Sequence, residues 1–334
     1  MKPYYADDSV TLYHGDSLDV LRRLDSGSVD CCVTSPPYFG LRDYGSEGQY
    51  GLEASPAEYV ETMRDVFAEV RRVLADDGTL WLNLGDSYST PKRGSDKGWD
   101  KSRINNPARV QKAQFAAMRE GRALDFDRPT KSLLGIPWRV AFALQDDGWV
   151  LRQEIIWAKA NCMPEAVKDR PSRNHEQVFL FSKRPRYWYD ADAIREDSDP
   201  EQTAHNERYA KVYAAQSDRA ADTGQPGNNN NAGIHSRPGK AGRNARSVWP
   251  INTQPFAEAH FATMPATLAE RCVLAGCKPG GTVLDPFSGS GTTGLVAGRQ
   301  GRRYVGIDLS ADYLDLSLRT RLAQTSILDG EVGA

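Results

Sequence analysis

The sequence predicts an α/β protein built on a mainly parallel sheet, and three observations support this fold class. Short apolar runs alternate with segments in which apolar residues recur at helical spacing, as in strands joined by crossover helices. Several apolar runs end in polar or glycine-rich loops, and open α/β sheets bind ligands at the carboxyl ends of their strands. The chain of 334 residues can bury a core in one large domain or two smaller ones.

Seven strands are expected from the short apolar runs. They are Val10–His14, Val29–Thr34, Thr79–Leu84, Val150–Trp157, Gln177–Ser182, Thr282–Leu284 and Arg303–Ile307. The helical pattern predicts helices at Pro56–Leu74, Leu133–Asp146, Pro265–Gly276 and Gly294–Gln300. In the first of these helices, Val60, Met63, Phe67 and Val70 recur at the helical period, and Asp76-Asp77-Gly78 closes it.

A glycine-rich loop follows the expected strand Thr282–Leu284. It reads Asp285-Pro286-Phe287-Ser288-Gly289-Ser290-Gly291-Thr292-Thr293. Gly289 and Gly291 would let the backbone approach a ligand closely, because neither has a side chain. No lysine follows the last glycine, which argues against a triphosphate loop. Asp308 ends the next strand, where a carboxylate can accept both hydroxyls of a ribose; a helix N-cap or solvated strand end is the alternative.

A Pro-Pro-aromatic run, Thr34-Ser35-Pro36-Pro37-Tyr38, follows the expected strand Val29–Thr34. The exocyclic amine of a base is a poor nucleophile, because its lone pair is delocalised into the ring. The Ser35 side chain and the Pro36 carbonyl can accept its hydrogens, and Pro36 and Pro37 hold that carbonyl in a fixed direction. Tyr38 would stack on a base that has left the helix. A plain Pro-Pro turn with a packed tyrosine is the alternative.

Together and in this order, the two motifs resemble those of S-adenosylmethionine-dependent DNA amino-methyltransferases. The cofactor loop comes second, an order that resembles the permuted β group of these enzymes. The resemblance implies a seven-stranded, Rossmann-like sheet in which six strands are parallel and the last inserts antiparallel. Lys159–Glu176 would then connect the final two strands.

The resemblance implies that S-adenosylmethionine is the cofactor. The implied cofactor-binding residues are Asp16, Phe261, Thr263, Asp285, Pro286, Phe287, Ser288, Gly289, Gly291, Thr292 and Asp308, and the implied catalytic residues are Ser35, Pro36, Pro37 and Tyr38. Asp285 would meet the cofactor's ammonium group directly or through water, and Phe287 would pack on its adenosine or methionine portion. Asp16 would lie by the adenine amine, although a helix N-cap would look the same.

The first residue of the Pro-Pro motif bears on the target base. Ser35 in this position is more typical of cytosine-N4 enzymes in the resembled family, whereas aspartate is more typical of adenine-N6 enzymes. The expected function is therefore site-specific methylation of cytosine N4 in duplex DNA after base flipping, with adenine N6 as the alternative. An RNA or protein amide methyltransferase and an inactive DNA-binding relic are further alternatives.

Two polar segments do not fit the sheet. The expected catalytic core comprises residues 1–85, 134–185 and 250–334, interrupted by a basic insertion at 86–133 and a partly flexible target-recognition segment at 186–249. Asp86–Ser132 holds eleven Lys or Arg residues against six Asp or Glu residues. Both segments are expected to contact DNA, with solvated loop surface as the alternative. In the connection Lys159–Glu176, Arg170 and Arg173 could meet phosphates or cap the target site.

The bulk composition excludes several other classes of protein. The net charge of −2 means that contact with double-stranded DNA must come from local basic segments. The five cysteines form no C-x-x-C pair, so neither a disulfide framework nor a metal site is expected. No apolar signal region or membrane-length run is present, which predicts a cytoplasmic protein without a membrane partner. A dimer and a cognate restriction enzyme remain open as partners.

Overall fold

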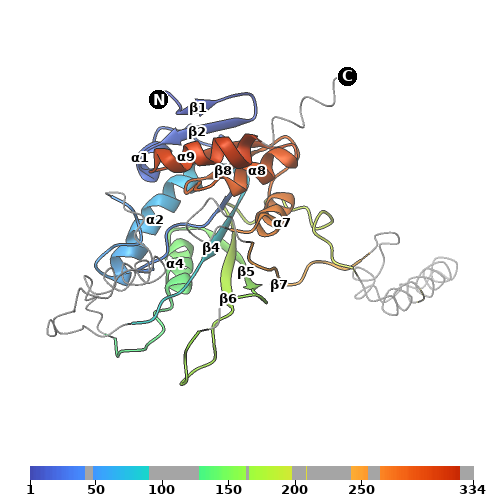
Figure 1. Ribbon diagram of the computed structural model, residues 1–334. Helices are drawn as coiled ribbons and strands as arrows, with labels where there is room; N and C mark the ends of the chain where they lie inside the picture. The colour runs from blue at the N-terminus through green and yellow to red at the C-terminus, as the bar shows by residue number, and fades with distance from the viewer. Residues whose placement is uncertain are drawn as a thin grey trace, which may run out of the picture. The chain divides into compact units, whose positions relative to one another are not determined.

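The computed structural model describes residues 1–41, 48–89, 128–162, 165–197, 208, 242–254 and 264–323. The chain divides into two units, one of Met1–Tyr189 with Ser247–Ala334 and one of Asp190–Arg246. The first unit contains the α/β sheet (Figure 1). In the second unit, an isolated antiparallel β-bridge pairs the backbones of Glu196 and Arg243. Most of the expected basic insertion and of the expected target-recognition segment lies outside the described residues.

The described residues form one sheet of nine strands, so the prediction of seven was wrong. The strands are β1 (Tyr5–Ala6), β2 (Val10–His14), β3 (Val29–Thr34), β4 (Leu74–Leu84), β5 (Val150–Ala158), β6 (His175–Ser182), β7 (Val248–Pro250), β8 (Thr282–Asp285) and β9 (Arg303–Asp308). Their spatial order is β1-β2-β9-β8-β3-β4-β6-β5-β7. The two extra strands, β1 and β7, are short edge strands of two and three residues, too short to give an apolar pattern.

The seven predicted strands are all present between these edges. β2, β9, β8, β3 and β4 pair in parallel, and β6 pairs antiparallel with both β4 and β5. The central strands β3 and β8 are buried along nearly their whole length because both of their faces are covered. Within β3, Cys31 and Cys32 are fully buried, and burial raises the pKa of both thiols, as expected for packing residues rather than reactive ones.

Helices cover the sheet in two groups. They are α1 (Ser17–Leu21), α2 (Pro56–Val73), α4 (Ile136–Asp146), α7 (Ala266–Gly276), α8 (Thr292–Arg299), α9 (Ala311–Ser317) and the π-helix η2 (Leu318–Leu322). α2 packs against α1 and α4, whereas α7 packs against α8, which contacts η2 (Figure 1). No helix in the described ranges has the length and apolar character needed to cross a bilayer.

The sequence of α2 explains both where it starts and what it supports. Ser55 caps the helix by accepting a hydrogen bond from the Glu58 amide at 3.2 Å. The Glu58 carboxylate reaches back and accepts from the Ser55 hydroxyl and from the Ala54 amide, each at 3.2 Å. Tyr59, Met63 and Phe67 are fully buried along one face of the helix. The Tyr59 hydroxyl donates to the Pro37 carbonyl at 2.9 Å, so this helix also holds the Pro-Pro turn.

Candidate active site

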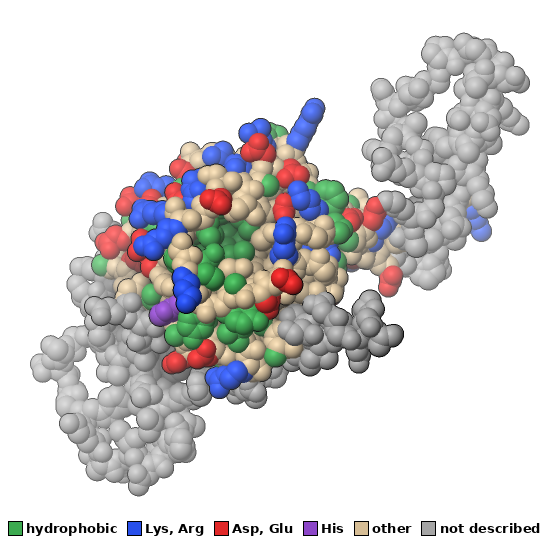
Figure 2. Space-filling view, turned by 90° about the horizontal axis from the view of Figure 1, so that it is seen from above, with side chains coloured by type: hydrophobic (Ala, Val, Ile, Leu, Met, Phe, Trp, Pro, Cys, Tyr) green, Lys and Arg blue, Asp and Glu red, His purple; other side chains and the backbone are tan. Residues whose placement is uncertain are grey.

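The carboxyl ends of the parallel strands open into one cavity of about 310 Å³. The loops after β3 and β8 and the ends of β2, β4, β5 and β9 contribute to its lining. Because β6 runs antiparallel, its first residues reach the same edge of the sheet. Charged side chains of both signs are interspersed on the molecular face in Figure 2.

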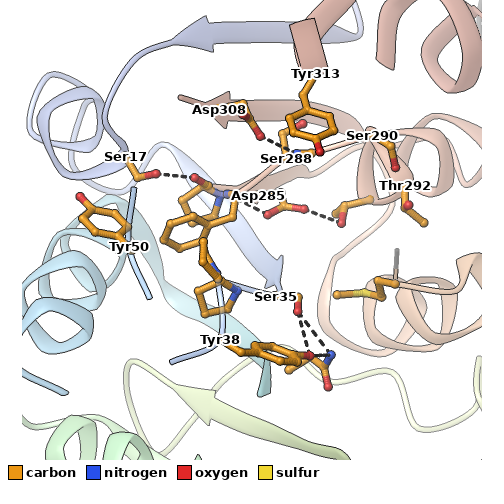
Figure 3. A pocket seen from close by; sticks show the side chains of 18 of the residues that line it. Ser17, Ser35, Tyr38, Tyr50, Asp285, Ser288, Ser290, Thr292, Asp308 and Tyr313 are labelled. Carbon is orange, nitrogen blue, oxygen red and sulfur yellow. Dashed lines mark hydrogen bonds between the residues drawn. The ribbon is translucent and has the colours of Figure 1, made fainter. Parts of the chain in front are cut away.

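Most of the predicted site residues line this cavity. The lining residues among them are Asp16, Ser35, Pro36, Pro37, Tyr38, Asp285, Pro286, Phe287, Ser288, Gly289, Thr292 and Asp308. Gly291 is not among the lining residues, and Phe261 and Thr263 lie outside the described residues. Figure 3 shows Ser288 and Asp308 toward one end of the cavity, Ser35 and Tyr38 toward the other, and Asp285 between them.

The two glycine positions of the loop differ in what a side chain there would meet. Gly289 has φ of 51°, and the nearest atom to a Cβ built there would be the Phe287 carbonyl oxygen at 3.9 Å. Gly291, the N-cap of α8, has φ of 77°, and a Cβ there would lie 2.8 Å from the Ser317 Cβ. Close packing against α9 therefore requires glycine at 291, whereas Gly289 leaves room beside the cavity.

Asp285 is 4% exposed and connects the glycine loop to β3. Its Oδ1 accepts hydrogen bonds from the Thr34 hydroxyl at 2.6 Å and the Phe287 amide at 3.1 Å, and its Oδ2 accepts one from the Thr293 hydroxyl at 2.8 Å. Burial raises its pKa to about 6, although these donors oppose the shift. The carboxylate thus joins the two sequence motifs, because Thr34 directly precedes Ser35. Its contact with a cofactor ammonium stays a prediction.

Asp308 lies at the end of β9 with both carboxylate oxygens held. Oδ2 accepts from the Gly289 amide at 2.7 Å, and Oδ1 accepts from the Ser310 amide at 2.8 Å. Burial raises the pKa of this carboxyl as well. Each oxygen keeps a further lone pair, so the carboxylate can still accept hydroxyl hydrogens from a ligand.

The Asp16 side chain caps α1 and lines the cavity, and its place beside a cofactor's adenine amine stays a prediction. Its Oδ1 caps α1 by accepting from the Asp19 amide at 3.0 Å, while its Oδ2 accepts from the Tyr50 hydroxyl at 2.6 Å. The Tyr50 ring meets the Phe287 ring edge-on, with centroids 5.8 Å apart. Asp16 is therefore an N-cap that also lines the cavity, and Tyr50, which sequence reasoning missed, lies beside it.

The Pro-Pro turn is held from three sides. Tyr59 binds the Pro37 carbonyl, and Gly51 packs so closely that a Cβ there would lie 2.9 Å from the Tyr38 carbonyl oxygen. Gly85 follows β4, and a Cβ there would lie 2.5 Å from Cε2 of the Tyr38 ring. Glycine at 85 is thus required for the observed ring position.

A polar cluster surrounds the Tyr38 hydroxyl; we call its five members, Ser35, Tyr38, Asn83, Lys159 and Glu176, the Ser35 cluster. Tyr38 donates to Glu176 Oε2 at 2.7 Å and accepts from Ser35 Oγ at 3.2 Å. Asn83 Nδ2 donates to the Tyr38 hydroxyl at 2.7 Å and to Glu176 Oε2 at 3.0 Å. Lys159 pairs with the other oxygen of Glu176.

Sequence reasoning assigned no site role to Asn83, Lys159 or Glu176. The one sequence signal is Asn83 itself, a polar residue inside the apolar run of β4 that is only 2% exposed. A buried amide needs hydrogen-bond partners, but the sequence does not identify them.

The two arginines expected near phosphates are paired within the protein. Arg173 lies 3.6 Å from Asp86 and donates to the Gln177 side chain at 3.1 Å. Arg170 donates to Glu165 at 2.7 Å and lies over the Tyr88 ring, 4.2 Å from its centroid. A role in phosphate contact stays a prediction for both.

The fold and the cavity define a class: a methyltransferase-like α/β protein with a ligand site at the carboxyl edge of its sheet. A family model described as a DNA methylase, N6_N4_Mtase, matches residues 29–319. The chain therefore belongs to this family of DNA amino-methyltransferases, which the two motifs resemble.

Two relatives agree with this assignment. The chain is 45% identical over 315 residues to the type II methyltransferase M.Cfr9I of Citrobacter freundii, covering 93% of this chain and 87% of that one. It is 43% identical over 310 residues to M.SmaI of Serratia marcescens, covering 91% and 87%.

Among solved structures, the fold is similar to the PvuII DNA methyltransferase, described as cytosine-N4-specific, with a TM-score of 0.61, 20% identity and coverage of 95% and 88%. It is also similar to a DNA modification methylase of Thermus thermophilus, TTHA0409, in complex with S-adenosyl-L-methionine, with a TM-score of 0.52, 22% identity and coverage of 94% and 95%. These two similarities concern the fold.

Proposed function

We propose that the protein is a type II, site-specific DNA methyltransferase that transfers the methyl group of S-adenosylmethionine to N4 of cytosine. One observation carries this proposal: a single cavity joins the glycine loop to the Ser-Pro-Pro-Tyr turn. A methyl donor and a base amine bound at its two ends would face each other. The order of the two motifs along the chain supports a permuted, β-group arrangement, and the relatives' type II names support a role in restriction–modification.

The glycine-loop end fits S-adenosylmethionine. Gly289 leaves space where any other residue would place a Cβ, and Asp308 retains lone pairs for the ribose hydroxyls. Phe287 and Tyr50 offer apolar surface to the adenosine or methionine portion, and Asp16 would lie near the adenine amine. The complex of TTHA0409 with S-adenosyl-L-methionine supports this choice of cofactor. Bound there, the cofactor supplies a methyl group on a positively charged sulfur.

The Ser-Pro-Pro-Tyr end fits the amine of a flipped base. Ser35 Oγ and the Pro36 carbonyl accept hydrogens of the amine, which favours a pyramidal nitrogen with its lone pair directed at the methyl group. Tyr38 supplies an aromatic surface for the base, replacing the stacking lost on leaving the duplex. The residue type at 35 and the cytosine-N4 specificity of the PvuII enzyme favour cytosine N4 over adenine N6.

Transfer of labelled methyl groups tests this proposal. Duplex DNA of mixed sequence is incubated with the protein and tritiated S-adenosylmethionine, and acid-precipitable label is counted. Ser35→Ala and Asp308→Ala should each abolish most of the incorporation, the first with retained cofactor binding and the second with weakened binding. Ser28→Ala and Asp312→Ala are matched controls at exposed positions and should behave as the parent protein. No incorporation by the parent protein, despite cofactor binding and varied DNA, would refute the proposed activity.

A further inference from the structure

We propose that Glu176 is the terminal acceptor of the proton that leaves the substrate amine, reached through the hydroxyls of Tyr38 and Ser35. This inference rests on the proposed function and deepens it. Ser35 would touch the amine. Glu176 does not touch the substrate and acts only through Tyr38 and Ser35, so we call it a positioning residue. Glu176 comes from β6, so the sequence does not place it beside the Pro-Pro turn.

The hydrogen bonds of the Ser35 cluster run in one direction. Ser35 Oγ donates to the Tyr38 hydroxyl at 3.2 Å, and that hydroxyl donates to Glu176 Oε2 at 2.7 Å. Each hydroxyl has a single hydrogen, and both hydrogens are directed toward the carboxylate. The lone pairs of Ser35 Oγ are then left to accept from a donor in the cavity, such as an amine. Figure 3 shows Ser35 and Tyr38 side by side at this end of the cavity.

Asn83 fixes this direction. Its Nδ2 donates to the Tyr38 hydroxyl at 2.7 Å and to Glu176 Oε2 at 3.0 Å, which are the two short contacts that its two hydrogens can make. The contact from Nδ2 to Ser35 Oγ is longer, 3.4 Å. Because Asn83 donates to the Tyr38 oxygen, the Tyr38 hydrogen is directed to Glu176 rather than back to Asn83.

The unsatisfied atom of Asn83 supports the same orientation of its amide. Asn83 Oδ1 is buried and has no hydrogen-bond partner among the described residues. The flipped amide would place this oxygen against the Glu176 carboxylate, setting two acceptors 3.0 Å apart, which is worse than leaving Oδ1 unpaired. An amide takes up no proton at neutral pH, so Glu176 is the proton acceptor within the Ser35 cluster.

Lys159 completes the arrangement. Its ammonium pairs with Glu176 Oε1, and the two side chains are only 16% and 17% exposed. The ammonium also lies 4.1 Å from the centroid of the Trp157 ring. Because Lys159 binds Oε1, the other carboxylate oxygen, Oε2, is left for Tyr38.

The proton balance of the transfer follows from these contacts. The amine nitrogen forms a bond to the methyl carbon, and the carbon–sulfur bond breaks with its electron pair passing to sulfur. One proton of the nitrogen passes to Ser35 Oγ as the Ser35 proton passes to the Tyr38 oxygen and the Tyr38 proton passes to Glu176 Oε2. The product is a neutral methylamino group, and Glu176 carries the proton until solvent removes it.

The test uses Tyr38→Phe and Glu176→Gln, with Glu176→Asp as the conservative variant and Glu61→Gln, at an exposed position on α2, as the control. The single-turnover rate of methyl transfer is measured in H₂O and in D₂O with saturating cofactor and DNA, and cofactor affinity is measured by calorimetry. The relay predicts a solvent isotope effect in the parent protein. It also predicts that Tyr38→Phe and Glu176→Gln lower the rate roughly 10²-fold, lose the isotope effect and keep cofactor affinity. Glu176→Asp should recover part of the rate.

Three results would overturn the relay. The first is a parent protein that shows no solvent isotope effect, and the second is a Glu176→Gln variant with a rate close to that of the parent. The third is a Glu176→Gln variant that is slow but keeps the isotope effect, because this would indicate that Glu176 has only a structural role. If Glu176→Gln fails to fold, Tyr38→Phe alone decides, because it keeps the ring and removes only the hydroxyl. A parent protein that methylates DNA while the variants behave normally refutes the relay alone, whereas an inactive parent refutes the proposed function.

Discussion

Gly85→Ala tests whether the position of the Tyr38 ring sets the rate of methyl transfer. A Cβ at residue 85 would lie 2.5 Å from Tyr38 Cε2 and 2.6 Å from Cδ2. Carbon atoms pack at about 3.5 Å or more, so the ring must move by about 1 Å. A misplacement of that size costs roughly 10²-fold in rate, equivalent to about 2.7 kcal/mol in the activation free energy.

The assay is single-turnover methyl transfer with saturating cofactor and DNA, accompanied by calorimetric measurement of cofactor affinity. The rate should fall as calculated, while cofactor affinity stays near that of the parent, because Gly85 lies at the Tyr38 end of the cavity. The control is the same substitution in a Tyr38→Ala background, where no ring remains to be displaced and the additional loss should be small. A parent-like rate for Gly85→Ala, or an equal loss in both backgrounds, would refute the reasoning.

Three further predictions concern other parts of the site. Tyr38→Ala should lower turnover strongly with nearly unchanged cofactor affinity by calorimetry; lost binding would contradict its placement at the substrate end. Burial raises the pKa of Asp285 from 3.8 to about 6, so the folded protein holds the Asp285 proton more tightly than the unfolded chain does. The stability that this proton contributes is present below about pH 4 and is lost as the pH rises through about 6. In urea unfolding, the parent should lose up to about 3 kcal/mol relative to Asp285→Asn between pH 4 and pH 7, and a pH-independent difference would contradict this assignment. Gly301→Ala should lower the unfolding free energy by about 1 kcal/mol because of its positive φ, and Gly291→Ala should lower it by more, because an alanine there also meets Ser317. Equal unfolding free energies of the two variants would exclude that clash.

The pattern of the central strands was predictable because these strands are buried on both faces. Apolar runs such as Val29–Thr34 coincide with the observed strands, and helix α2 ends within one residue of its expected end. β4 was expected to begin at Thr79 but begins at Leu74, because β3 continues to pair with it through an irregularity between Val29 and Cys31. Such irregular pairing depends on the partner strand and leaves no apolar signal of its own.

The start of helix α4 shows a different limit. The apolar pattern placed it at Leu133, whereas it begins at Ile136, after Gly135 in the left-handed conformation. The Asp86 side chain accepts a hydrogen bond from the Ile136 amide at 2.9 Å, so the cap comes from a residue far away along the chain. Local sequence patterns do not reveal a cap of this kind.

The candidate site was predictable where one short motif carries it, and not where distant segments meet. The glycine loop and the Pro-Pro turn could be recognised from their own residues. Asn83 and Glu176 join the Pro-Pro turn through hydrogen bonds that depend on the order of β4 and β6 in the sheet. For Gly291 the structure adds a packing reason that the sequence did not reveal, since a Cβ there would meet Ser317 in α9, and its contact with a cofactor stays a prediction.

Nucleoside mass spectrometry of methylated DNA tests the central claim most directly. Mixed-sequence duplex DNA is incubated with the protein and S-adenosylmethionine labelled in its methyl group, digested to nucleosides and analysed by mass. The account predicts labelled N4-methylcytosine in the parent reaction and only a small fraction of that amount with Ser35→Ala. Labelled N6-methyladenine would keep amine methylation but contradict the base assigned from Ser35, and labelled 5-methylcytosine would contradict transfer to an amine altogether.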